Sequence, residues 1–82
     1  MKTVEYTVQL GTLCLSDLEQ IFSELANNGC SLMIRSDAAR QSNLFTCAIS
    51  VIENPERSVR RDAGTMTEAI MLCLRAYLNK PV

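Results

Sequence analysis

The sequence predicts an α+β fold, a two-layer sandwich in which two helices cover one face of a mainly antiparallel sheet of three or four strands. Residues 3–10 and 43–52 alternate apolar and polar side chains, the period-two pattern of strands with one buried face. Two other segments, after Ser16 and after Thr65, repeat apolar residues at helical spacing. The expected order is β-α-β-β-(β)-α in a single domain spanning residues 1–82.

In the first half of the chain, a strand over residues 3–10 would bury Val4, Tyr6, Val8 and Leu10, and Gly11 would end it. A capping box, Ser16-x-x-Glu19, predicts the start of a helix. The apolar face of this helix would comprise Leu18, Ile21, Phe22 and Leu25. Asn27-Asn28-Gly29 is a stop signal, because glycine adopts the left-handed conformation that follows many last turns.

In the second half, residues 30–35 predict a short strand, residues 37–42 a polar connection and residues 43–52 a longer strand. Glu53-Asn54-Pro55-Glu56 predicts a turn. Residues 57–63 fit either a returning edge strand or a loop, and their arginines would suit an edge strand that must not pair with another chain. Thr65-x-x-Glu68 is a second capping box, and the final helix, before Lys80-Pro81, would bury Met66, Ala69, Ile70, Cys73, Leu74 and Tyr77.

Composition narrows the function classes. The net charge of −1 argues against nucleic-acid binding through bulk charge. The four cysteines lie beside apolar residues, which predicts reduced thiols in the core and a reducing, cytoplasmic location. A disulfide is the alternative, because the even number of cysteines fits it as well. No stretch reaches the roughly 18 apolar residues of a membrane span, and the N-terminus lacks a signal-peptide pattern.

No catalytic or metal-binding motif is recognisable. The chain has no histidine and no C-x-x-C pair, so neither a nucleophile with a marked base nor a zinc site is indicated. Glycine-rich phosphate loops are absent from the sequence as well. We therefore expect a non-enzymatic protein with no cofactor and no metal.

One local cluster has the chemistry of a binding site: Arg57-Ser58-Val59-Arg60-Arg61. Guanidinium groups bind carboxylates and phosphates through paired hydrogen bonds. We predict that Arg57, Arg60 and Arg61, helped by Arg35 on the polar sheet face, contact an acidic protein surface or a phosphate. Alternation would place Arg57 and Arg61 on one side and Arg60 on the other. The alternative is an ordinary solvated turn.

From residue 43 onward the chain resembles the αβββα double-stranded-RNA-binding domain, through residues 44–52, the arginine segment and the last helix. Such domains carry lysines at the start of the final helix, whereas here that region reads Thr65-Met66-Thr67-Glu68. Residues 29–78 also resemble small phage proteins of the helix–sheet–helix (ABA sandwich) kind, through Gly29, residues 44–52 and Thr67-Glu68-Ala69-Ile70 with Leu72, Leu74 and Ala76.

The phage resemblance implies a small binding protein that inhibits a host defence complex, as anti-CRISPR proteins do, in the cytoplasm of a bacterial host. Two alternatives stay open. One is a structural oligomer subunit. The other is a nucleic-acid-binding module of double-stranded-RNA-binding architecture, which would use Arg57, Arg60, Arg61, Arg35 and Arg40. The expected partner is a protein, a homodimer is compatible with the small size of the domain, and no membrane is expected to take part.

Overall fold

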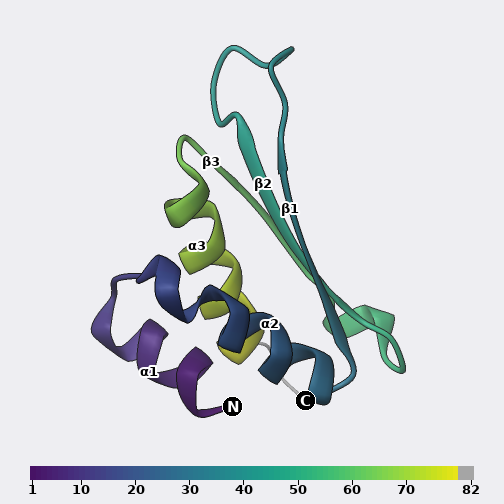
Figure 1. Cartoon of the computed structure of the whole chain (residues 1–82). Coiled ribbons are helices and arrows are strands. Elements are labelled where there is room, and N and C mark those ends of the chain that lie inside the picture. Colours follow the sequence, from purple (N-terminus) through teal and green to yellow (C-terminus); the bar gives the residue numbers. More distant parts are fainter. Residues whose placement is uncertain (80–82) are drawn as a thin grey trace.

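A computed structural model describes residues 1–79 and contains three helices and a three-stranded sheet (Figure 1). The helices are α1 (Lys2–Leu10), α2 (Leu18–Asn27) and α3 (Met66–Asn79). The strands are β1 (Cys30–Ser36), β2 (Phe45–Val51) and β3 (Val59–Ala63). Two 3₁₀ turns, Leu15–Asp17 and Pro55–Arg57, complete the order α1-α2-β1-β2-β3-α3. The α+β class is confirmed, whereas Lys80-Pro81 falls outside the described residues.

The strand predicted over residues 3–10 is wrong, because this segment forms α1. Val4 and Val8 also fit the helical period, which prevails: Val4 and Thr7 are buried and Val8 packs against the core, while Tyr6 and Leu10 stay exposed. The Glu24 carboxylate of α2 stabilises the helix by accepting hydrogen bonds from the backbone N–H groups of Thr3 and Val4, each at 3.0 Å. A side chain distant in sequence thus supplies the cap that the first turn of α1 needs.

The capping box predicted at Ser16 is also wrong. The Ser16 hydroxyl lies 2.9 Å from Cys14 Sγ, and α2 begins two residues later, at Leu18, without a side-chain cap. The end of this helix is as predicted. Gly29 turns the chain from α2 into β1. Its φ of 76° lies in the left-handed region, which is strained for residues that carry a side chain.

The sheet has the order β1-β2-β3, and both pairs are antiparallel. Residues 57–63 resolve into the end of a 3₁₀ turn followed by the edge strand β3. The second capping box is confirmed in its main contact, because the Thr65 hydroxyl accepts a hydrogen bond from the Glu68 N–H at 3.1 Å. The helix that follows buries the predicted stripe, apart from a half-buried Met66.

The core lies between one face of the sheet and the helices α2 and α3. Helix α2 packs on β1, and α3 packs on β2 and β3. Helix α1 packs against the other two helices (Figure 1). The described order therefore replaces the predicted first strand by a helix that adds to the helical side. The largest fully buried side chains include Ile21, Leu25, Ile49, Ile70 and Leu74.

All four cysteines are free. Cys30, Cys47 and Cys73 are buried, as predicted for core thiols, whereas Cys14 is exposed. The Cys73 thiol donates to the Cys47 carbonyl oxygen at 3.4 Å, directly beneath the sheet. The Cys47 thiol donates a hydrogen bond to Cys73, which together with burial raises its pKa, so this group stays neutral.

Candidate partner-binding surface

The sheet has an open face on the side away from the helices. Strand alternation and the register place eight side chains there, in rows that cross the strands. One row joins Met33, Ala48 and Arg60, and the next joins Arg35, Thr46 and Asp62. Ser31 and Ser50 form the third row. We call this set the open face: Ser31, Met33, Arg35, Thr46, Ala48, Ser50, Arg60 and Asp62.

The four arginines predicted to bind a partner do not form one cluster. Arg35 and Arg60 both project from the open face and are exposed. Arg61 pairs with Cys47 in the register and therefore projects on the helix side of β3. Arg57 lies in the 3₁₀ turn before β3. The structure thus brings Arg35 and Arg60 to one surface and separates the other two from it.

Arg57 packs against the protein. Its guanidinium carbon lies 5.8 Å from the centre of the Tyr77 ring, within the range of a cation–π contact. Its Nε atom is buried and has no hydrogen-bond partner among the described residues. The stem and head of Arg57 therefore help to close the core at the end of α3, which the sequence pattern did not indicate.

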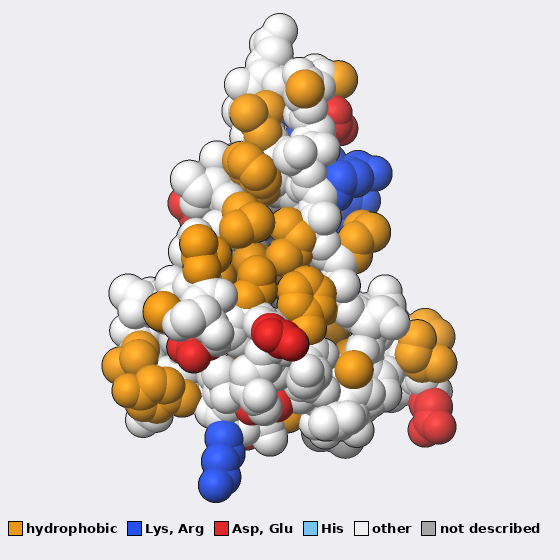
Figure 2. Space-filling view, viewed as in Figure 1, with side chains coloured by type: hydrophobic (Ala, Val, Ile, Leu, Met, Phe, Trp, Pro, Cys, Tyr) orange, Lys and Arg blue, Asp and Glu red, His pale blue; other side chains and the backbone are white. Residues whose placement is uncertain are grey.

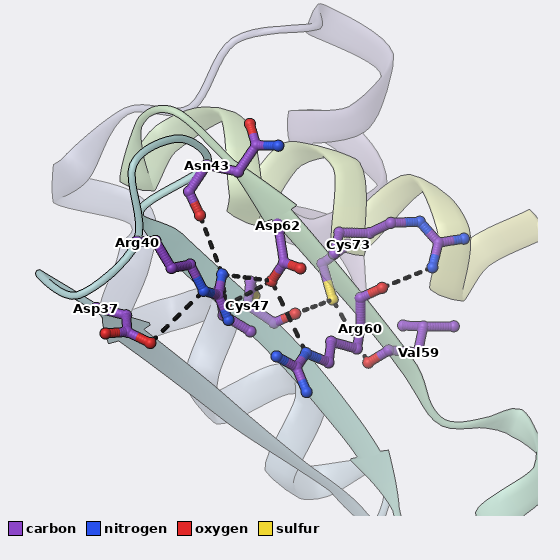
Figure 3. A network of polar contacts seen from close by, with 10 residues as sticks. Asp37, Arg40, Asn43, Cys47, Val59, Arg60, Asp62 and Cys73 are labelled. Atoms are coloured by element: carbon purple, nitrogen blue, oxygen red, sulfur yellow. Dashed lines mark hydrogen bonds and ion pairs between the residues drawn. The ribbon is translucent and has the colours of Figure 1, made fainter.

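Arg61 covers the outer edge of β3. Its Nη1 atom donates to the carbonyl oxygen of Arg60 at 2.7 Å (Figure 3). An open hollow of about 410 Å³ lies beside it, between β3 and the end of α3, and is lined by Ser58, Val59, Arg60, Arg61, Ala76 and Asn79. The predicted role of arginines at an edge strand, to prevent pairing with another chain, fits this contact.

Arg40, which the sequence suggested only for the nucleic-acid-binding alternative, forms the centre of the polar network on the open face (Figure 3). Its Nη1 atom donates to the Asn43 carbonyl at 3.0 Å and to the Thr46 hydroxyl at 3.1 Å. The same atom lies 3.3 Å from Asp62 Oδ1, and Nε lies 3.6 Å from Asp37. The connection between β1 and β2 is thereby folded back onto the sheet.

Asp62 joins this network from β3. The Thr46 hydroxyl donates to its carboxylate at 2.5 Å, and Arg60 Nε lies 3.8 Å from the same oxygen. The hydrogen bond from Thr46, with further help from Arg40 and Arg60, lowers the pKa of Asp62 against the opposing effect of desolvation. The carboxylate is therefore ionised at neutral pH and neutralises much of the charge of Arg40.

The charge that remains available on this surface belongs to Arg35 and Arg60. Within residues 1–79, Arg35 takes part in no ion pair, and Arg60 has only the long contact to Asp62. Arg35, Arg40 and Arg60 contribute three positive charges against two negative charges from Asp37 and Asp62, a net of +1. Met33, 51% exposed, lies in the same row as Arg60 and adds an apolar contact.

The sequence contained only a partial signal for this surface. The period-two pattern placed Arg35 on the polar sheet face, but it did not indicate the connection that folds over this face. Arg40 lies in the connection between β1 and β2, residues 37–44. Its contact with Asp62 depends on where β3 lies in the sheet. Only the tertiary structure brings Arg40 to Asp62, 22 residues later in the chain.

No group of three or more potential metal ligands occurs within residues 1–79. In the same part of the chain, no helix is both long and apolar enough to cross a bilayer. Comparison with known proteins found no matching family model, no matching curated protein and no matching solved structure. The open face therefore has to be interpreted from its own chemistry.

Proposed function

We propose that this chain is a non-enzymatic binding domain that recognises an acidic surface of a partner protein through the open face. The observation that carries the proposal is the joint position of Arg35, Arg60 and Met33 on one side of a rigid sheet. Exposed arginines beside an apolar side chain are typical of residues that concentrate binding energy in protein interfaces.

The network around Arg40 supports the proposal by rigidifying the surface. Its hydrogen bonds hold the connection of residues 37–44 against the sheet, so that a partner would meet a preformed shape. Preorganised side chains lose less conformational entropy when they bind. Arg35 and Arg60, which flank the network, supply the charge that a carboxylate-bearing partner would pair with.

The phage resemblance suggests a first class of partner to test, a bacterial defence complex that this chain would inhibit. Tagged wild-type protein serves as bait for such complexes, next to a double variant, Arg35→Glu and Arg60→Glu. Arg75→Glu provides a matched control, because Arg75 is an exposed arginine on α3, away from the open face. If Arg75→Glu leaves capture intact, the loss in the double variant is due to the position of Arg35 and Arg60 and not to a change in net charge.

We expect the double variant to lose the partner and the control to retain it, with unchanged thermal unfolding in both. Capture by wild type should also weaken as salt is added, because exposed ion pairs are screened. Equal capture by all three proteins would contradict a role for the open face. Arg57 is left unchanged in these variants, since its contact with Tyr77 belongs to the core.

A second candidate function, nucleic-acid binding, has one observation in its favour. From α2 onward the described elements follow the order α-β-β-β-α, the order of the double-stranded-RNA-binding architecture. The first turn of α3 contains Glu68 and no lysine, which disfavours phosphate there. A mobility shift with duplex RNA across a salt series tests this candidate, because phosphate contacts give a steep loss of affinity with salt.

A further inference from the structure

The two edge strands of the sheet, β1 and β3, differ in length and in charge. The difference matters because the outward backbone N–H and C=O groups of an edge strand have no partner in the sheet. Strand β3 has five residues, three of them charged, and Arg61 occupies an outward carbonyl. Strand β1 has seven residues, and Arg35 is its only charge. Long, weakly charged edge strands are templates for pairing with another strand.

The ladder between β1 and β2 defines which groups of β1 face outward. Ile52 N–H donates to the Gly29 carbonyl, and Asp37 N–H donates to the Leu44 carbonyl. Residues alternate in direction along an antiparallel strand, so the odd positions of β1 bond to β2. The N–H and C=O groups of Cys30, Leu32, Ile34 and Ser36 therefore point away from β2, along the free edge.

Apolar side chains accompany these free groups. Cys30 is buried, but Leu32 and Ile34, on the same face of the strand, are only half-buried. The hairpin of β1 and β2 extends beyond the helices (Figure 1), and apolar side chains gather between the helices and this hairpin (Figure 2). The half-buried pair thus lies where the helical layer covers the sheet incompletely.

We infer that a second copy of this chain pairs with β1 in antiparallel orientation, forming a continuous six-stranded sheet around a twofold axis at Met33. This register overlaps all seven residues. It places Leu32 opposite Ile34 of the copy, Met33 opposite Met33, Ser31 opposite Arg35, and Cys30 opposite Ser36. The strand is self-complementary, because apolar residues meet apolar residues and no like charges oppose each other.

Neighbouring registers are less favourable. With outward groups paired to outward groups, an axis at Leu32 leaves the groups of Ser36 unpaired and an axis at Ile34 leaves those of Cys30 unpaired, so both registers are shorter. An axis at Arg35 also sets two arginines against each other, which is destabilising. An axis at Ser31 shortens the overlap further and leaves Ile34 unpaired. Only the axis at Met33 uses every free N–H and C=O group of the edge.

The twofold axis also explains the incomplete cover over β1. It runs perpendicular to the sheet, so the helices of both copies lie on the same face. Helix α2 follows directly into β1 and covers its Cys30 end. The axis would bring the α2 helix of the copy over the Ile34 end.

Helix α2 presents apolar surface for this contact. Phe22, which is 37% exposed, lies nearly opposite to Glu24 around the helix, and Glu24 faces α1. The flank of α2 that faces away from α1 is thus partly apolar. A strand pair alone buries less than the roughly 1,200–2,000 Å² typical of stable interfaces, so this helical contact is needed.

The dimer does not depend on the proposed function, although it would double the open face by aligning two copies. The first test measures the mass of the wild-type protein by sedimentation equilibrium over a wide concentration range, with two variants of the exposed Ser31. Ser31→Glu places a carboxylate opposite Arg35 of the copy, twice per dimer. Ser31→Lys places two like charges opposite each other, also twice.

We expect Ser31→Glu to tighten the dimer roughly 2- to 30-fold and Ser31→Lys to weaken it by a similar factor, from the usual strength of cross-strand charge pairs. Both variants should keep the thermal unfolding of the isolated domain, since residue 31 projects from the open face. A wild-type protein that stays monomeric at its highest soluble concentration would overturn the inference. So would a dimer that responds to neither charge, because it would use another surface.

The second test locates the axis. In a Cys14→Ser background, Met33→Cys would place two thiols in a closely spaced cross-strand pair of the dimer, within disulfide distance. Mild oxidation should yield a covalent dimer. Ser50→Cys, exposed on the same face but on the central strand, is the matched control and should stay monomeric under the same conditions. Equal cross-linking of both variants, or of neither, would rule out pairing around Met33.

Discussion

The two edges of the sheet, β1 under α2 and β3 under α3, are covered by their helices to different extents. Helix α3 buries six residues against β2 and β3 over its 14-residue length. Helix α2 has ten residues and buries two, Ile21 and Leu25. The side of α3 is thus closed by the chain itself, whereas the side of α2 leaves Leu32 and Ile34 half-exposed.

The difference teaches that a small sheet can keep one edge closed and the other available. On β3, charged residues and the contact of Arg61 with the Arg60 carbonyl discourage further strands. On β1, the free N–H and C=O groups run alongside apolar side chains. The chain thereby separates a surface that stabilises the monomer from one that is suited to association.

The largest expected effect tests the two helical sides directly. Ile70→Ala should destabilise the fold by roughly 3–5 kcal/mol, because Ile70 is fully buried in the densely packed side and its loss leaves a cavity. Leu25→Ala should cost less, roughly 2–3 kcal/mol, since α2 is more loosely surrounded and its neighbours can relax. Urea denaturation of both variants measures the difference.

The control for this pair is Leu15→Ala, at an exposed position in the first 3₁₀ turn, which should change stability by only a few tenths of a kcal/mol. If Leu25→Ala proves as costly as Ile70→Ala, the two sides are equally well packed and the comparison fails. The measurement is made at low protein concentration, where a dimer would contribute least.

The sequence was sufficient for the elements whose signals are local and unambiguous. The alternation of residues 45–51, the glycine at position 29 and the threonine cap at position 65 each specify one structure. The antiparallel sheet and the apolar stripe of α3 followed from them. The α+β class was therefore predictable from residues 28–79 alone.

The first element was not predictable from its own residues. Residues 3–10 satisfy a strand pattern through Val4, Tyr6, Val8 and Leu10, and a helical one through Val4 and Thr7. What decides between them is Glu24, whose carboxylate binds the first turn of α1 from another helix. In the candidate site the same limit applies, because Arg40 and Asp62 meet only once three strands are assembled.

A second prediction concerns this tie between α1 and α2. Burial alone would raise the pKa of Glu24, but hydrogen bonds from the Thr3 side chain and from the amides of Val4 and Thr3 outweigh it. They lower the pKa from 4.5 to about 2. A carboxylate with a lowered pKa stabilises the fold at pH values above its ordinary pKa of 4.5. This contribution decreases below that pH and is lost as the pH falls through about 2. Glu24→Ala should cost roughly 1–2 kcal/mol at neutral pH, allowing for solvent screening.

The measurement is urea denaturation of wild type and Glu24→Ala between pH 7 and pH 2. The difference in free energy of unfolding should shrink below about pH 4.5 and be smallest near pH 2. Glu19→Ala, at an exposed position on the same helix, is the control and should show little pH-dependent difference. A cost that is independent of pH would mean that Glu24 acts through packing rather than through its charge.

A third prediction tests the start of α3, the helix that closes the β3 side. Thr65→Ala removes the hydroxyl that accepts from the Glu68 N–H and should cost about 1 kcal/mol. Thr67→Ala, in the same exposed turn, keeps that cap and should be close to neutral. Thermal unfolding of the two variants side by side distinguishes the cap from a general effect of removing a threonine.

The smallest effect on stability, and the sharpest test of the two edges, is expected for Arg61→Ala. The side chain is exposed, so its loss should change the free energy of unfolding by less than about 0.5 kcal/mol. It frees the outward carbonyl of Arg60, which gives the sheet a second edge able to pair.

Association of Arg61→Ala is then measured by light scattering at rising protein concentration. If β1 already pairs with a second copy, an open β3 edge allows dimers to join into larger assemblies, and scattering should exceed that of wild type. Arg60→Ala leaves the Arg61 contact in place and should behave like wild type. Adding Ser31→Lys to Arg61→Ala should suppress the growth, because chain extension requires both edges. Identical scattering by Arg61→Ala and Arg60→Ala would show that the charge of β3, rather than the covered carbonyl, keeps that edge closed.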